Sequence, residues 1–197
     1  FKGTNKRPSY LDISRELDAV GADFNAFTYK DYTGYYVKVD SNHADLAFDL
    51  VSDIVFSSKI EEKEVEKEKG VIVEELRMYE DNPTMAVDLL FDKAMFGSHP
   101  LGRDIGGSAQ TVRAMTQKDL FDYYKKYYSP SNAVLVVAGN IKNNQLKKLL
   151  NYFSSVSGKR RDIGWKEFER FGWEKKNLPL EKRVLVNTRK IDQTHLI

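Results

Sequence analysis

Glu68 and Glu75 are the two residues of this sequence whose type and spacing could support metal chemistry. Both lie in a charge-rich segment that predicts one long helix over residues 61–80. At about 100° per residue, positions seven apart lie nearly above one another, so the two carboxylates share one face of that helix. A carboxylate at the edge of an apolar face needs a partner, and a metal ion would supply one.

The apolar stripe of the same helix indicates which glutamates lie near the core. Val65, Ile72 and Leu76 fall on one stripe, which predicts the buried face. Glu75 lies roughly 60–80° from the centre of that stripe, whereas Glu74 lies opposite it. We therefore expect Glu75 to edge the buried side and Glu74 to face solvent. Taken alone, the pattern also suits a solvated helix with Glu–Lys pairs at i,i+4 spacing.

The other elements favour an α+β fold, with helices packed on one face of a mainly antiparallel sheet. Ser9, followed by Asp12, predicts a helix start, and the Lys30–Asp31 step predicts a tight hairpin. The apolar run at residues 132–139 predicts a buried central strand. The expected helices are 9–21, 42–54, 61–80, 83–96, 116–128 and 143–153; the expected strands are 23–30, 33–40, 132–139, 183–188 and 193–197; loops cover 97–108 and 157–180.

Composition excludes several classes of protein. The chain is 41% hydrophobic and 30% charged, as expected of a globular protein with a real core. Its 31 basic and 29 acidic residues nearly balance, which gives no reason to expect a nucleic-acid partner. It contains no cysteine, so disulfides and thiolate metal sites are excluded. No apolar run reaches the roughly 20 residues that span a bilayer, and we expect a soluble protein, cytoplasmic if bacterial.

The histidines and the clustered tyrosines have simple structural explanations. His43, His99 and His195 contain no i,i+4 pair, so each is expected to be an ordinary surface or structural residue. Four tyrosines belong to one predicted helix: Tyr123, Tyr124, Tyr127 and Tyr128. For these we favour core packing over a place in a substrate chamber.

Six stretches, in order, resemble the N-terminal catalytic half of peptidase family M16, the pitrilysin, insulinase and mitochondrial processing peptidase type of zinc metallopeptidase. The first, Phe-Lys-Gly-Thr at residues 1–4, is similar to the residues that follow the inverted zinc motif H-x-x-E-H in that family. The others are residues 21–28, 80–83, 99–103, 132–139 and 191–195. The resemblance implies an α+β LuxS/MPP-like metallohydrolase half-unit.

The same resemblance implies roles for particular residues. Glu75 matches the third zinc ligand, beside two histidines of H-x-x-E-H, and Glu68 matches a catalytic glutamate that supports the metal shell. Zinc would activate a water, and the glutamate of H-x-x-E-H would accept its proton as general base. The matching edge strand would bind extended peptide substrate by main-chain pairing; its residues are Asn25, Ala26, Phe27 and Thr28.

The sequence departs from the family pattern in one respect, because it contains no H-x-x-E-H. Either that motif lies upstream of Phe1, or this is a metal-free fragment. The resemblance assigns residues 1–180 to a first, catalytic-type domain that is N-terminally incomplete, and residues 181–197 to the start of a second, homologous domain or to its linking strand. It also implies that a homologous domain or partner chain closes over the site as a clamshell, in a homodimer or heterodimer. Two alternatives stay open: a non-catalytic M16 subunit that presents substrate or acts as scaffold, and an unrelated α+β peptide-binding module.

Overall fold

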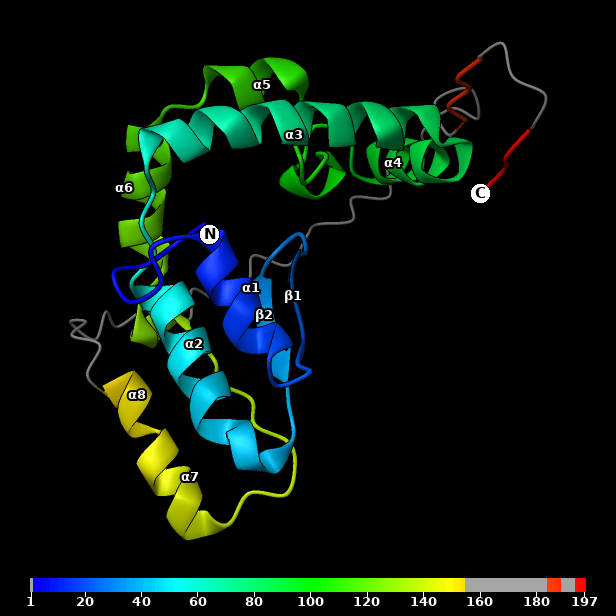
Figure 1. Ribbon diagram of the computed structural model, residues 1–197. Coiled ribbons are helices and arrows are strands. Elements are labelled where there is room, and N and C mark those ends of the chain that lie inside the picture. The colour runs from blue at the N-terminus through cyan, green and yellow to red at the C-terminus, as the bar shows by residue number, and fades with distance from the viewer. Residues whose placement is uncertain (1, 155–183, 189–193) are drawn as a thin grey trace. The chain divides into compact units, whose positions relative to one another are not determined.

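The computed structural model describes residues 2–154, 184–188 and 194–197, and these form two compact units that we describe separately (Figure 1). The first unit takes its described residues from Phe1–Val65 and Thr116–Trp165. The second takes them from Glu66–Met115 and Lys166–Ile197.

The first unit combines a hairpin with helices. Its elements are α1 (Tyr10–Asp18), β1 (Asp23–Thr28), β2 (Thr33–Lys38), the 3-10 turn η1 (Ser41–His43), α2 (Ala44–Phe56), α6 (Gln117–Tyr127), η3 (Pro130–Asn132), α7 (Asn143–Leu149) and α8 (Asn151–Ser154). The helix α3 (Glu62–Asp81) leads into the second unit, which also contains α4 (Pro83–Phe96), η2 (Pro100–Gly102) and α5 (Ala109–Ala114).

The predicted hairpin is confirmed. β1 and β2 pair antiparallel, in a register that runs from Asp23 opposite Lys38 to Thr28 opposite Thr33. The Tyr29 N–H donates to the Tyr32 carbonyl at 2.8 Å and closes the turn between the strands. Strand register is therefore fixed at the turn as well as along the ladder.

Helix α1 begins where the sequence predicts. The Ser9 side chain accepts from the Asp12 N–H while the Asp12 carboxylate accepts from the Ser9 N–H, which is a complete capping box. Leu17 of this helix is fully buried and packs with Leu50 of α2, and partly buried residues of both strands cover the same cluster. The predicted arrangement of helices on one face of an antiparallel sheet is thus present, on a sheet of two strands.

The prediction of a buried central strand at residues 132–139 is wrong in this structure. The backbone of Ala133 is extended, yet Val134 and Val136 are 89% and 81% exposed. Among the described residues, β1 and β2 form the only sheet, so this extended segment has no neighbour with which to form a ladder. Residues 184–188 and 194–197 likewise lie outside regular structure, and the predicted linker at 157–180 falls outside the described residues.

The second unit has a small core where α3 meets α5. Val73 and Leu76 of α3 pack with Val112 of α5, and all three are buried. The sequence pattern missed α5, which begins after a capping box between Ser108 and Thr111 in a glycine-rich stretch. Helix α4 begins as predicted at Pro83, because the Asn82 side chain accepts from the N–H groups of the next turn.

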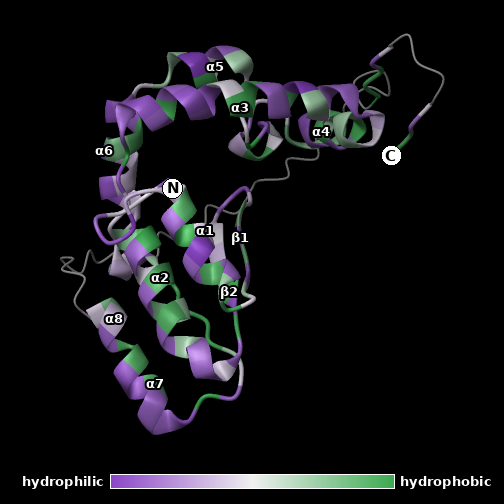
Figure 2. Cartoon of the chain, in the orientation of Figure 1, coloured by the Kyte–Doolittle hydropathy of each residue, from purple (hydrophilic) through white to green (hydrophobic). Residues whose placement is uncertain are grey.

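Hydropathy colouring shows α2 as largely apolar and α3 as largely polar (Figure 2). A second apolar cluster joins α2 to α7 and consists of Ala44, Phe48 and Leu149. Of the helices in the described parts of the chain, none has the length and apolarity needed to cross a membrane.

Gly70 gives a first testable prediction about α3. This glycine lies inside a 20-residue helix, and a Cβ added there would meet no atom within 4 Å. Gly70→Ala should therefore stabilise the full-length protein by about 0.5–1 kcal/mol, since alanine has less conformational entropy to lose. Denaturant unfolding measures this change in the free energy of unfolding. Gly106→Ala is the matched control and should destabilise, because its Cβ would lie 2.7 Å from Leu76 Cδ2; a loss of stability in Gly70→Ala would contradict the prediction.

Candidate functional site

The two glutamates of α3 differ in exposure. Glu68 is half-buried, whereas Glu75 is exposed, so the prediction that Glu75 edges the buried side is wrong in this structure. The reason is Val73, which the sequence-based stripe omitted and which is only 4% exposed. Including it moves the centre of the buried face by about 20°, away from Glu75. The prediction that Glu74 faces solvent is confirmed.

Glu75 also differs from Glu66 and Glu74, two other glutamates of α3, in its ion pairing. The carboxylate of Glu66 accepts from Lys69 at 2.6 Å, and that of Glu74 accepts from Arg77 at 2.7 Å. Within the described residues no hydrogen bond or ion pair engages the Glu75 carboxylate. Its oxygens are consequently available to an external ligand, and a metal ion could bind them without first breaking an ion pair.

The described residues alone do not complete a metal site. Among them, no three histidine, cysteine, aspartate or glutamate side chains come together as a candidate metal-binding group. A zinc site uses three or four nitrogen, oxygen or sulfur ligands. The donor chemistry of Glu75 fits one position of such a site, and the other ligands must come from outside the described residues.

Strand β1 carries the residues expected to bind substrate. Asn25, Ala26, Phe27 and Thr28 pair with Tyr36, Tyr35, Gly34 and Thr33, respectively. All four are exposed, and in the described residues β1 has β2 as its single strand neighbour. Its other edge therefore presents main-chain N–H and C=O groups that can receive an extended peptide.

The ring of Phe27 lies directly over Gly34 on the paired strand. A Cβ on Gly34 would lie 2.3 Å from Phe27 Cζ, so only glycine leaves room for the ring in this position. Phe27 also makes edge contacts with Tyr29 and Tyr32, with ring centroids 5.6 Å and 6.1 Å apart. These contacts hold an exposed aromatic surface at the end of the hairpin.

The four tyrosines predicted to pack in the core divide into two pairs. Tyr124 and Tyr128 are half-buried, and the Tyr124 hydroxyl accepts from the Ser58 N–H at 3.2 Å. The hydroxyl of Tyr128 lies 3.2 Å from that of Tyr35 on β2; burial, together with this contact, raises the pKa of Tyr35. Tyr123 and Tyr127 are exposed and stack on each other, so core packing is wrong for this pair.

The structure gives His99 a structural role. Its Nδ1 accepts from the Leu101 N–H at 3.1 Å and caps the turn η2, as expected of a structural histidine. His43 ends η1 and precedes α2 without a side-chain capping bond, and His195 is exposed.

Two open hollows lie beside α3, and neither is lined by a candidate glutamate. The larger, about 670 Å³, is lined by Glu74, Arg77, Met78, Asp81, Asn82 and Pro83. The smaller, about 340 Å³, is lined by Glu66, Lys69, Gly70, Val73, Glu74 and Arg113. Neither lining includes Glu68 or Glu75, so shape alone does not identify the candidate site.

Comparison with models of known protein families identifies the family of this chain. The family model for insulinase, peptidase family M16, matches residues 1–109, which is more than half of the chain. The chain belongs to peptidase family M16. A second model, for the M16 inactive domain, matches residues 114–197.

Several relatives of this M16 chain are named as zinc proteases. An uncharacterized zinc protease of Streptomyces coelicolor is 39% identical over 198 residues, covering 100% of this chain and 42% of the relative. An uncharacterized zinc protease of Bacillus subtilis is 38% identical over 196 residues, covering 100% of this chain and 45% of the relative. The chain thus spans less than half the length of these curated relatives.

The fold agrees with solved structures. That of a putative M16-like peptidase from Alicyclobacillus acidocaldarius superposes with a TM-score of 0.68 at 31% identity, over 75% of this chain and 34% of that one. The structure of a protease from Helicobacter pylori superposes with a TM-score of 0.76 at 24% identity, over 82% of this chain and 39% of that one. At 24% identity the second match shows the fold alone, and the two matches together confirm the predicted fold of an M16 half-unit. The division into residues 1–180 and 181–197 stays a prediction.

Proposed function

We propose that this chain is part of a zinc-dependent endopeptidase that hydrolyses peptide bonds in extended peptides. The observation that carries the proposal is the match to the M16 family model over residues 1–109, with relatives named as zinc proteases. The resemblance assigns the third-ligand position to Glu75, and the absence of an ion pair at that carboxylate among the described residues is compatible with this role.

In this proposal, Glu75 shares the zinc ion with two histidines of an H-x-x-E-H segment that precedes Phe1 in the full-length protein. Bound zinc supplies an activated water for attack on the scissile carbonyl. Glu68 lies about two helical turns before Glu75 on the same face of α3. In this proposal it orients the residues that bind the metal.

Strand β1 positions the substrate. An extended peptide pairs with the free edge beside Asn25, Ala26, Phe27 and Thr28, so that main-chain hydrogen bonds supply affinity whatever the side chains. The exposure of all four residues supports this role. Folded proteins hold their strands in their own sheets, and unfolded or extended peptides are therefore the preferred substrates.

A second M16 half, in the same chain or in a partner chain, completes the chamber in this proposal. The relatives support it, since the Streptomyces and Bacillus proteins are each more than twice as long as the matched segment. The other candidate function is a non-catalytic M16 subunit, and the family's model of an inactive domain over residues 114–197 keeps it in consideration.

The coding sequence and two assays of the full-length protein distinguish the peptidase from the non-catalytic subunit. The coding sequence upstream of Phe1 is read for H-x-x-E-H, and the purified protein is assayed for zinc content and for chelator-sensitive cleavage of a fluorogenic peptide. The peptidase requires the motif, about one zinc per site and cleavage that metal restores after chelation. Absence of the motif, with no metal-dependent cleavage, would establish the scaffold instead.

Glu68→Gln tests the supporting role of that residue. We expect zinc affinity to fall by about 10–100-fold, because loss of a residue that orients a metal ligand has this effect. Competition with a chromophoric chelator measures the affinity. Glu66→Gln is the control, since Glu66 is exposed and pairs with Lys69 on the same helix; equal affinities in the two variants would contradict the role of Glu68.

A further inference from the structure

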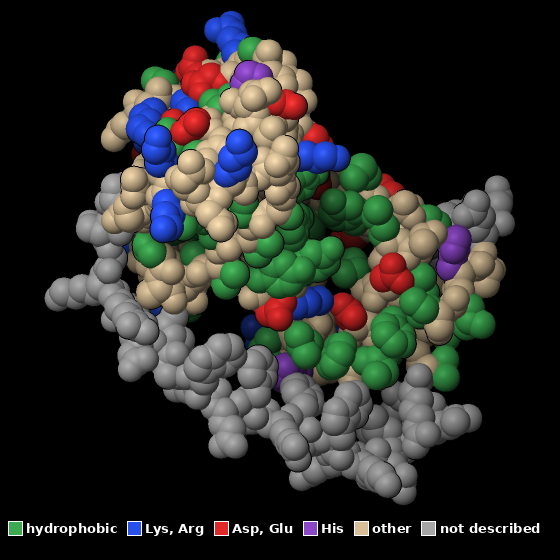
Figure 3. All heavy atoms as spheres, turned by 90° about the horizontal axis from the view of Figure 1, so that it is seen from below, with side chains coloured by type: hydrophobic (Ala, Val, Ile, Leu, Met, Phe, Trp, Pro, Cys, Tyr) green, Lys and Arg blue, Asp and Glu red, His purple; other side chains and the backbone are tan. Residues whose placement is uncertain are grey.

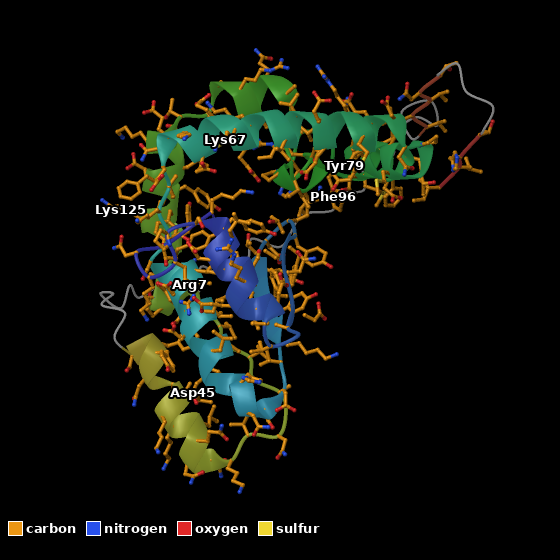
Figure 4. The ribbon with its side chains drawn as sticks, viewed as in Figure 1. Arg7, Asp45, Lys67, Tyr79, Phe96 and Lys125 are labelled. Atoms are coloured by element: carbon orange, nitrogen blue, oxygen red, sulfur yellow. The ribbon has the colours of Figure 1, made fainter. Side chains whose placement is uncertain are left out.

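A buried ionic cluster ties the N-terminal residues to α2. The side chains of Arg7 and Asp53 are 5% and 4% exposed, and Thr4 is completely buried. Figure 4 shows Arg7 beside α2. Three carboxylates surround this one guanidinium, which is unusual for a group so far removed from water.

All three nitrogens of the guanidinium donate hydrogen bonds to carboxylates. Its Nη1 donates to Asp53 Oδ2 at 3.0 Å, and its Nη2 donates to Asp49 Oδ2 and to Glu16 Oε2, both at 2.8 Å. Its Nε donates to the same Glu16 oxygen at 2.9 Å. Arg7 therefore joins α1, which carries Glu16, to α2, which carries both aspartates.

The same cluster fixes the backbone that precedes α1. Thr4 Oγ1 donates to Asp53 Oδ2 at 2.5 Å and accepts from the Arg7 N–H at 2.9 Å. The Thr4 N–H donates to the Arg7 carbonyl at 2.7 Å, which closes a loop over Thr4–Arg7. A Cβ on Gly3 would lie 2.4 Å from the Pro8 carbonyl oxygen, so the chain doubles back tightly on itself here.

A further bond continues this anchor beyond α2. The Lys59 N–H donates to the Gly3 carbonyl at 2.9 Å, just after the C-terminal end of α2. Gly3 is thus held from both sides, by the loop that follows it and by residues after α2. These hydrogen bonds fix the path of the backbone immediately after Lys2, and all of them lie within the first unit.

We propose that Arg7 is a positioning residue for the metal site, because the cluster it organises fixes the point from which the zinc-binding segment enters the fold. The inference rests on the proposed function, which places the two histidines shortly before Phe1. Metal ligands must be held within about half an ångström of their working geometry. Residues 3–7 are the anchored chain nearest to that segment in the sequence.

The charges of the cluster support such a role. Although burial acts to lower it, hydrogen bonds that Arg7 donates to the carboxylates of Glu16, Asp49 and Asp53 hold the pKa of Arg7 above its ordinary value. Burial likewise acts to raise the pKa of Asp49, but hydrogen bonds from Lys6 and Arg7 hold it below its ordinary value. The pair therefore stays ionised near neutral pH. A buried ion pair is weak support for stability, whereas it can specify one geometry.

The test compares three variants of the full-length protein. Arg7→Met removes the charge, and Arg7→Lys keeps the charge but loses the planar fork that bonds to three carboxylates. Leu149→Ala is the control: this residue is 1% exposed in the cluster between α2 and α7, and its loss lowers stability without touching the Arg7 cluster. The measurements are zinc affinity by chelator competition, and amide hydrogen exchange at Thr4 and Lys59 in the metal-free protein.

We expect both Arg7 variants to bind zinc about 10–100-fold more weakly, the range seen for residues that orient metal ligands. Exchange at Thr4 and Lys59 should be faster in both. Leu149→Ala should lower the unfolding midpoint and leave zinc affinity unchanged. If the wild-type protein binds zinc and both Arg7 variants bind it equally well, the positioning role is overturned while the proposed function stands. A wild-type protein that binds no zinc overturns the proposed function first.

Discussion

Glu75→Gln in the full-length protein is expected to reduce peptidase activity and zinc affinity by more than about 100-fold. Loss of a residue that merely supports a metal ligand costs about 10–100-fold, and loss of the ligand itself should exceed that range. The amide keeps the size of the side chain and removes the negative charge that zinc requires. Zinc content after dialysis, together with cleavage of a fluorogenic peptide, measures both effects.

Glu74→Gln is the matched control for this prediction. It removes one carboxylate from the adjacent position and breaks an exposed pair with Arg77, which contributes about 0–1 kcal/mol. We expect zinc content and activity close to those of the wild-type protein. If Glu75→Gln retained full zinc content, or if Glu74→Gln lost it, the assignment of the ligand to position 75 would be wrong.

Leu17→Ala is expected to lower the free energy of unfolding by about 2–5 kcal/mol. Leu17 is fully buried where α1 packs against α2, so alanine would leave a cavity in the main cluster of the first unit. Total stabilities are typically about 5–15 kcal/mol, and this loss would be a large share of them. Denaturant unfolding of the full-length protein, followed by circular dichroism, measures the change.

The same helix provides the control. Leu11 is 59% exposed and lies about 120° around the helix from Leu17. Leu11→Ala should change the free energy of unfolding by no more than about 0.5 kcal/mol, as is usual for surface positions. Similar losses in the two variants would mean that α1 packs by a different face.

Local signals in the sequence predicted the elements whose ends are fixed by side chains. The capping boxes at Ser9 and Thr116 place the starts of α1 and α6, and Asn82 followed by Pro83 places the start of α4. The hairpin follows from its β-branched and aromatic residues and from the short turn between them. Each of these features depends on residues close in sequence, which a single sequence displays directly.

Features that depend on distant partners could not be predicted in the same way. The apolar run at 132–139 predicts a strand, but a strand exists only where another chain segment pairs with it. The exposure of Glu75 depends on Val73, whose burial comes from α5, a helix that the pattern missed. The Arg7 cluster could not be predicted either, because Glu16, Asp49 and Asp53 lie 9, 42 and 46 positions after Arg7 in the sequence.

The apolar segment at 132–139 has a practical consequence. Hydrophobic side chains reach the molecular surface in the view of Figure 3. Val134 and Val136 are among the most exposed large hydrophobic residues in the described part of the chain. An extended backbone with such side chains and no ladder partner among the described residues is a template on which strands of other molecules can assemble. Residues 1–197 expressed by themselves should therefore self-associate with increasing concentration, and biochemical work belongs with the full-length protein.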